Sequence, residues 1–318
     1  MKSVIAIAII GTVALSCIYM FSAPTVGAEN QFQVFISTYN VGYSNGDEFD
    51  YRFSVFQSNL EKIAELNKIN PQATFGVNKF ADRTPEEMSQ MMKLTTGANC
   101  TDKNSTSYNV TDADWSGLYT SIKDQGQCGS CWAFSAVGSA EGRYAIFTHS
   151  PQINVSFSVQ QLIDCDTTSF GCSGGWMSNA FGYWLEHDIC NSTYYYTGVE
   201  GKCKICYTGI RLSSCDNLQP NVTAVASEIS EGPISVAVDA SSWAFYSGGI
   251  LTNCEESLNH GVTLVGLNQT EGSVDIINSW GGSWGERGHI RLGSNGTCGW
   301  HLVASVPNFN ETAVSIFE

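Results

Sequence analysis

The twelve cysteines are distributed unevenly, and this distribution constrains the fold more than any other feature of the 318-residue chain. Ten of them follow residue 112, and residues 29 to 95 contain none. So many cysteines are unusual in a compartment that keeps thiols reduced and typical of secreted proteins. We therefore expect a first unit that folds by apolar packing alone, followed by a second unit that disulfides hold together.

The N-terminus indicates the same secretory route. Lys2 precedes an uncharged apolar run from Val4 to Phe21, and small residues follow up to Ala28. This order predicts a cleaved signal peptide over residues 1–28. The alternative is an uncleaved membrane anchor, since the run approaches the length of a membrane-spanning helix. Asn-x-Ser/Thr sequons for glycosylation also suit this route. They begin at Asn99, Asn104, Asn109, Asn154, Asn191, Asn221, Asn268, Asn295 and Asn310.

The net charge excludes some classes of partner. The chain carries 15 basic and 30 acidic residues, a formal charge of -15. A chain this acidic offers no large basic surface for phosphate backbones or anionic lipid, so we expect neither a nucleic-acid partner nor membrane binding beyond the signal peptide. An acidic, lysosome-like compartment would neutralise part of the repulsion. We expect that location or an extracellular one.

Residues 29–111 are expected to form a helical unit and the segment that connects it to the cysteine-rich second unit. Phe49, Phe53, Phe56, Leu60 and Ile63 recur at spacings of three and four, which places them on one face of a long helix. Asp47 is the expected N-cap, and the Asn70-Pro71 step is expected to end the helix. From Thr96 to Asp112 the residues are small and polar, which predicts an exposed, flexible connection open to a processing protease.

The chemistry begins at the sequence QGQCGSCWAFS, residues 125–135. Cys128 and Cys131 could form a redox dithiol, or Cys131 could be a nucleophile with Cys128 in a structural disulfide. A proline-free, mostly apolar run follows Cys131 and predicts a buried helix. The N-terminal end of such a helix stabilises a thiolate.

A thiolate nucleophile needs a proton acceptor, and His260 is the strongest candidate. It immediately precedes a β-branched, apolar run that predicts a strand, whereas His149, His187, His289 and His301 have no such setting. Asn278 ends a later predicted strand, where its amide oxygen can accept a hydrogen bond from one imidazole nitrogen. The other ring nitrogen then remains for Cys131.

With these residues the chain resembles the papain-like cysteine proteases of the cathepsin L-like subfamily. The Cys-Gly-Ser-Cys-Trp sequence, with a histidine and an asparagine about 130 to 150 residues downstream, is the mark of that family. Two patterns of the family's propeptides are also present. The first comprises Glu48, Arg52, Phe56, Asn59, Ile63 and Asn67, and the second Gly76, Asn78, Phe80 and Asp82.

The resemblance implies a mixed α+β, two-domain fold. A helical left domain would carry Cys131, and a β-rich, barrel-like right domain would carry His260 and Asn278. It implies a division into a signal peptide (1–28), a helical inhibitory propeptide (29–111) and a peptidase domain (112–318). The tail of the propeptide would cross the substrate cleft in the non-productive direction.

The resemblance also implies roles for individual residues. Gln125 and the backbone N–H of Cys131 would form the oxyanion hole, and Trp280 would cover the Asn278–His260 hydrogen bond. Gly174 and Gly175 would pair with an extended substrate. The main specificity pocket would be apolar and prefer aliphatic or aromatic side chains. Its residues would be Trp176, Met177, Ala237, Leu258 and Val303.

The resemblance further implies three disulfides, Cys128–Cys172, Cys165–Cys203 and Cys254–Cys298. Cys190, Cys206 and Cys215 remain, and we expect Cys206 to pair with Cys215, because this bond would close a short loop. Cys203 and Cys206 resemble half of a zinc site, but no second half follows, so we expect no metal and no cofactor.

We expect a monomeric cysteine endopeptidase, made as a zymogen, that acts on peptides and proteins and is inhibited by its own propeptide. Two alternatives remain at this point. One is a disulfide oxidoreductase that uses Cys128 and Cys131, and the other is a catalytically silent, glycosylated binding protein on a protease scaffold.

Overall fold

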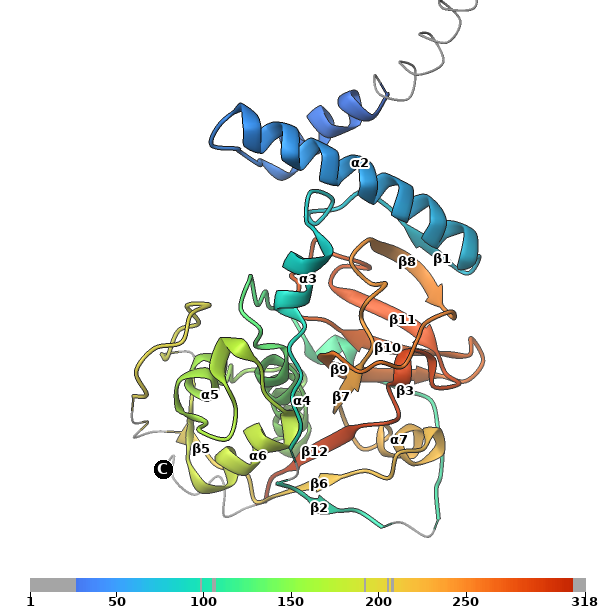
Figure 1. Ribbon diagram of the computed structural model, residues 1–318. Helices are drawn as coiled ribbons and strands as arrows, with labels where there is room; N and C mark the ends of the chain where they lie inside the picture. Colours follow the sequence, from blue (N-terminus) through green and yellow to red (C-terminus); the bar gives the residue numbers. More distant parts are fainter. Residues whose placement is uncertain are drawn as a thin grey trace, which may run out of the picture. The chain divides into compact units, whose positions relative to one another are not determined.

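A computed structural model describes residues 27–97, 99–104, 107–191, 193–204, 206 and 209–310 (Figure 1). The expected signal peptide lies outside the described residues, apart from its last two positions. Among the described residues, no helix combines the length and the apolar character needed to cross a bilayer. The described chain divides into two compact units. The first comprises 27–64 and 77–83, and the second comprises 65–76 and 84–310.

The first unit is built on aromatic side chains. Residues 27–39 are helical and are followed by α2 (Gly46–Ile69), whose residues up to 64 belong to this unit. Phe32, Phe35 and Phe56 are buried together, with ring centroids 5.1 Å apart for Phe32 and Phe56. Phe49, Phe53 and Leu60 pack against them, so the predicted apolar face of the helix is confirmed.

The ends of α2 differ in how well the sequence predicted them. The helix ends at Ile69, as the Asn70-Pro71 step predicted. Its N-cap is Asn45 and not Asp47, because the Asn45 side chain accepts a hydrogen bond from the Glu48 N–H at 2.9 Å. Asp47 lies inside the first turn, where an acidic side chain favours the positive end of the helix dipole.

Polar residues of the propeptide patterns connect α2 to the turn at residues 78–83. The Asn59 amide donates to the carbonyl oxygens of Ala81 and Arg83, each at 2.9 Å. The Arg52 guanidinium donates to the carbonyl oxygen of Asp82 at 2.9 Å. The Asp82 carboxylate accepts a hydrogen bond from Tyr43, also at 2.9 Å. These side chains therefore hold the turn against the helix.

The second unit contains a ten-stranded sheet in the order β1-β8-β11-β10-β9-β7-β12-β6-β2, with β3 paired to β9 (Figure 1). The strands are β1 (Ala73–Phe75), β2 (Thr101–Asp102), β3 (Ala113–Asp114), β6 (Ser214–Asn217), β7 (Ile234–Val238), β8 (Tyr246–Leu251), β9 (His260–Asn268), β10 (Ser273–Ile277), β11 (His289–Gly293) and β12 (Ala304–Asn308). β4 (Ile189–Cys190) pairs with β5 (Gly209–Ile210) separately. The order of the described strands has two ends, β1 and β2, so the sheet is open and the expected barrel does not close.

Helices complete the mixed α+β fold. They are α3 (Pro85–Met91), α4 (Cys131–Phe147), α5 (Val159–Cys165), α6 (Met177–Glu186), α7 (Val222–Glu228), and the single-turn helices η1 (Ser116–Leu118), η2 (Gly171–Ser173) and η3 (Thr297–Gly299). The helix α4 is buried on nearly all sides and packs against β9, β12, α5 and α6. It therefore connects the helical part of the unit to the sheet.

Five disulfides lie in the second unit, and they include the three pairs that the resemblance implied, Cys128–Cys172, Cys165–Cys203 and Cys254–Cys298. The suggested Cys206–Cys215 pair is wrong. Cys206 pairs with Cys190, and Cys215 pairs with Cys100. Cys100 precedes β2, which runs beside the strand β6 that carries Cys215. The connection after Thr96 is therefore attached to the second unit, whereas the sequence predicted a flexible segment.

Candidate active site

Cys131 is the first residue of α4 and is the free cysteine among the described residues. Its side chain is fully buried. The Cys128–Cys172 disulfide holds the chain three residues before it. Cys128 therefore has no thiol with which to resolve a mixed disulfide, and the redox interpretation of the two cysteines fails.

His260 and Asn278 are brought together by the pairing of two strands. His260 begins β9, which pairs with β10, and Asn278 directly follows the end of β10. The Nε2 atom of His260 lies 2.8 Å from Oδ1 of Asn278. The buried Trp280 ring lies over the imidazole, with centroids 5.0 Å apart. This arrangement shields the hydrogen bond between the two side chains from water.

The second imidazole nitrogen faces no hydrogen-bond partner among the described residues. His260 Nδ1 is buried and unbonded, so it is the nitrogen that remains for proton exchange. The start of β9 lies against the start of α4, because a Cβ atom on Gly261 would be 3.2 Å from the carbonyl oxygen of Cys131. The thiol and the imidazole are therefore carried by two elements that touch at this point.

Burial controls the protonation of this pair. It raises the pKa of the Cys131 thiol, although backbone groups of Gly261 and Lys93 favour the thiolate and oppose the shift. It also lowers the pKa of His260 to about 4, and the bond to Asn278 opposes that shift. Low-dielectric surroundings disfavour the charged form of each group, so burial favours a neutral thiol and a neutral imidazole at the covered site.

The side chain of Gln125 is held by hydrogen bonds at both ends. Its Oε1 accepts from the Ser279 hydroxyl at 2.6 Å. Its Nε2 donates to the carbonyl oxygens of Met91 and Cys128, each at 2.8 Å. The sequence did not identify Met91 or Ser279, although Ser279 is adjacent to Asn278. The amide donor of Gln125 is therefore oriented by Ser279 and occupied by the chain's own Met91.

The segment after Met91 pairs with the glycine-rich turn. Gly175 N–H donates to Lys93 O at 3.2 Å, and Thr95 N–H donates to Gly175 O at 3.0 Å. Leu94 and Gly175 form a parallel bridge. Gly174 has a φ of +121°, and a Cβ atom there would lie 2.8 Å from Lys93 O, so glycine is required for this approach. The chain thus covers its own candidate nucleophile.

Four of the five expected specificity residues belong to one apolar cluster. Met177 and Ala237 are buried in it, and Leu258 and Val303 pack against it. Leu94 packs against the same cluster. Trp176 directly precedes α6 and is half-buried. None of these side chains carries a charge, so the surroundings suit an apolar substrate group.

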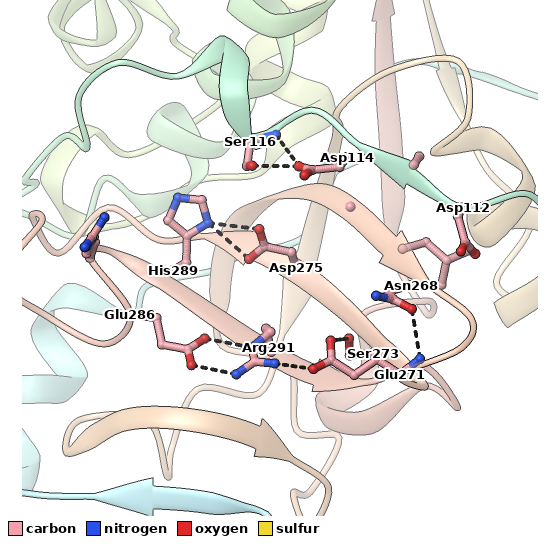
Figure 2. A pocket seen from close by; sticks show the side chains of 14 residues that line it. Asp112, Asp114, Ser116, Asn268, Glu271, Ser273, Asp275, Glu286, His289 and Arg291 are labelled. Atoms are coloured by element: carbon pink, nitrogen blue, oxygen red, sulfur yellow. Dashed lines mark hydrogen bonds and ion pairs between the residues drawn. The ribbon is translucent and has the colours of Figure 1, made fainter.

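A separate hollow of about 570 Å³ is lined by residues of β3, β9, β10 and β11 (Figure 2). Five of its charged side chains form ion pairs with one another. His289 Nδ1 lies 3.1 Å from the Asp275 carboxylate, and Arg291 binds Glu286 at 2.7 Å and Glu271 at 2.5 Å. Cys131, His260 and Gln125 do not line this hollow, so we place the chemistry at the covered site.

Two sequence families match the chain. The papain family cysteine proteases match residues 107–308, and the cathepsin propeptide inhibitor domain (I29) matches residues 32–88. Cathepsin L 1 of Paramecium tetraurelia is 39% identical over 294 residues, which cover 85% of this chain and 88% of that protein. A viral cathepsin of Adoxophyes honmai nucleopolyhedrovirus is 40% identical over 302 residues, which cover 86% and 88% of the two chains.

Solved structures show the same likeness. The digestive procathepsin L2 proteinase from Tenebrio molitor larval midgut aligns with a TM-score of 0.81 and 34% sequence identity. The alignment covers 89% of this chain and 100% of that one. The likeness therefore extends over the helical N-terminal region as well as the region that contains the candidate site.

Proposed function

We propose specific roles for Cys131, His260, Asn278 and Gln125, the residues of the site that the chain itself covers. These roles start from the fact that the chain belongs to the papain family of cysteine proteases. It is a cysteine protease that carries a propeptide inhibitor domain, and so a zymogen. One observation carries the assignment of roles. Cys131 at the start of α4 and His260 at the start of β9 lie on touching elements, and Asn278 holds the far nitrogen of the imidazole.

Once the covering segment leaves, water reaches the pair, and a proton moves from the Cys131 thiol to His260 Nδ1. The thiolate attacks the carbonyl carbon of the scissile bond, and the electron pair of the C=O bond moves to its oxygen. Gln125 Nε2 and the Cys131 N–H donate hydrogen bonds to that oxygen. The C–N bond then breaks, and His260 gives its proton to the departing amine. Water, deprotonated by His260, hydrolyses the thioester and restores the thiol.

The covering segment inhibits this reaction at two points. Met91 O occupies the Gln125 donor that the oxyanion would need, and residues 93–95 occupy the backbone groups of Gly175 that an extended substrate would need. The Leu94 bridge is parallel, which supports passage opposite to the productive, antiparallel direction. The segment therefore occupies the cleft without presenting a bond for attack.

We propose an endopeptidase that prefers an aliphatic or aromatic side chain in the main specificity pocket. Two observations support this preference. The expected pocket residues Met177, Ala237, Leu258 and Val303 are apolar, and the chain's own Leu94 packs against the same cluster. A substrate arginine would bring a charge to this surface without a carboxylate to pair it.

We also propose the cellular setting that the sequence predicted. The protein would enter the secretory pathway through a signal peptide at residues 1–28 and act as a monomer in an acidic, lysosome-like compartment or outside the cell. The sequons support passage through that pathway, because eight of the nine asparagines are exposed and Asn221 is half-buried. The division of the sequence into a propeptide region (29–111) and a peptidase region (112–318) is part of this proposal, and this division does not fix the bond that is cut during maturation.

A labelling experiment tests the assignment of the nucleophile. The precursor is processed at about pH 5 with reductant and then treated with a thiol-reactive epoxide, because a protonated imidazole beside a thiolate favours alkylation. We expect the adduct on Cys131 alone and no peptide hydrolysis by the Cys131→Ala variant. A Ser130→Ala variant, with its hydroxyl removed beside an intact thiol, serves as the matched control. Full activity of the Cys131→Ala variant would show that Cys131 is not the nucleophile.

A further inference from the structure

The Cys100–Cys215 disulfide links the connection to the body of the protease. The match to the propeptide inhibitor domain ends at residue 88, and the match to the peptidase begins at residue 107. Cys100 lies between the two, and Cys215 lies on β6 in the sheet. A cut on the C-terminal side of Cys100 would therefore leave the propeptide covalently attached to the enzyme that it inhibits.

Residues 100–104 and 107–111, which we name the docked arm, also bind the rest of the second unit through their backbone. The strand β2 runs parallel to β6. The Lys103 N–H donates to Asn217 O at 2.8 Å, and the Asn217 amide donates to Cys100 O at 3.1 Å. A backbone held in a strand ladder does not enter a protease cleft unless the ladder first opens.

Side chains of the docked arm extend these contacts. The Lys103 ammonium lies 2.7 Å from the carboxylate of Glu228, a buried residue on α7. The Tyr108 hydroxyl donates to Gln219 at 2.6 Å, and the Asn109 N–H donates to the Ser227 hydroxyl at 3.1 Å. The arm is therefore attached to the second unit along its length and not at the disulfide alone.

The sequons in this region give an independent argument. Asn99, Asn104 and Asn109 begin three sequons at intervals of five residues, and all three side chains are exposed. A glycan at every fifth residue would keep the arm out of a protease cleft, which must take up several consecutive residues in extended form. Residues 93–97 contain no sequon.

We infer that maturation cuts the chain between Lys93 and Gly97, and that the docked arm stays on the mature enzyme as an N-terminal extension anchored by the Cys100–Cys215 disulfide. The Thr95–Thr96 bond fits best, because it places Leu94 in the apolar pocket. That choice of bond rests on the proposed specificity. Water is added across the peptide bond, which leaves a carboxylate on Thr95 and an α-amino group on Thr96, and the disulfide is unchanged.

The cut requires the segment to leave its present position. Its parallel bridge to Gly175 is opposite to the proposed productive direction, so the bond is cut after the segment has left the cleft and entered that of a second enzyme molecule. This step leaves no bond between the released propeptide and the enzyme. Inhibition is therefore relieved without reduction of a disulfide.

The experiment determines the first residue of the mature enzyme. The glycosylated precursor is processed in acid without reductant, and the product is sequenced from its N-terminus and analysed by non-reducing and reducing electrophoresis. We expect the mature chain to begin between Leu94 and Gly97, to contain Cys100, and to release no peptide on reduction. A start after Cys100 would overturn the inference, whether or not a peptide with Cys100 remains attached by the disulfide.

A second experiment separates this inference from the proposed function. The Cys131→Ala precursor is cut by a trace of a different, active papain-family protease, so the position of the cut is measured even if the chain has no activity of its own. The double variant Cys100→Ser, Cys215→Ser should shift the first residue beyond position 100. The matched variant Cys190→Ser, Cys206→Ser should keep it between 94 and 97. If the mature Cys100→Ser, Cys215→Ser variant still begins between residues 94 and 97, the disulfide does not retain the docked arm.

Discussion

The Oδ1 atom of Asn278 lies 2.8 Å from Nε2 of His260 and also 2.8 Å from the N–H of Ser279, so the acceptor that orients the imidazole is itself held in place. The asparagine follows β10, and the histidine begins the neighbouring strand β9. Both residues thus take their positions from one strand pairing. The contribution of this arrangement to catalysis can be tested by replacing one residue at a time.

Replacing Asn278 with Ala should lower kcat/KM by about 100-fold, because a misoriented imidazole is no longer in the geometry that proton transfer requires. The mature enzyme is assayed with a peptide substrate, and thermal unfolding checks that the fold is intact. Asn253→Ala, which removes an exposed amide, is the matched control. Wild-type kcat/KM in Asn278→Ala would show that the hydrogen bond does not orient the catalytic ring.

Replacing Gln125 with Ala should reduce kcat by about 100-fold to 1,000-fold, as expected for loss of one oxyanion-hole donor. The same variant should bind the free propeptide more weakly, because Met91 O loses its 2.8 Å hydrogen bond to the amide. Kinetics on the mature enzyme and inhibition by added propeptide measure the two effects. Gln152→Ala, at an exposed glutamine, should change neither quantity. Unaltered kcat in Gln125→Ala would exclude its role in the oxyanion hole.

The covered precursor should lose stability as the pH falls from 6.5 towards 4. Burial lowers the pKa of His260 from 6.5 to about 4, so over this range the unfolded chain binds a proton that the folded chain does not. The stability contributed by the neutral ring is therefore complete above pH 6.5 and falls by about 3 kcal/mol towards pH 4.

Denaturant unfolding of the Cys131→Ala precursor, which cannot process itself, measures this effect. Adding His260→Gln should remove about that much of the pH dependence, whereas adding His149→Gln, at an exposed histidine, should leave it unchanged. Identical pH profiles with and without His260 would contradict the effect. Acid thus favours an open site, in which the imidazole is hydrated and charged.

The main pocket should accept leucine at least about tenfold better than alanine in kcat/KM, because each buried methylene contributes about 1 to 3 kcal/mol to discrimination. Arginine should be accepted poorly, since the cluster around Met177 and Ala237 is apolar. A peptide series varied at the position next upstream of the cleaved residue measures this, with the same series one position further upstream as control. Arginine equal to leucine would refute the apolar pocket.

Local sequence patterns predicted much of the site. Cys131 is followed by a proline-free, apolar run that forms α4, and His260 immediately precedes the apolar run of β9. Such signals are short-range, because they depend on the conformational preferences of adjacent residues. The N-cap was predicted less well, since Asn45 and Asp47 both have suitable side chains and only the backbone geometry selects Asn45.

Residues far apart in the sequence were harder to pair. Cys215 was expected to close a short loop with Cys206, yet it bonds to Cys100, 115 residues away, because β2 lies beside β6 at one end of the sheet. The occupation of the Gln125 amide by Met91 O is likewise a contact across 34 residues. The sequence by itself determined the candidate nucleophile, its candidate base, the asparagine expected to orient that base, and the propeptide patterns. Only the tertiary structure decided which strand lies beside which, and so where the connection is held, because strand order depends on packing across the whole unit and not on neighbouring residues.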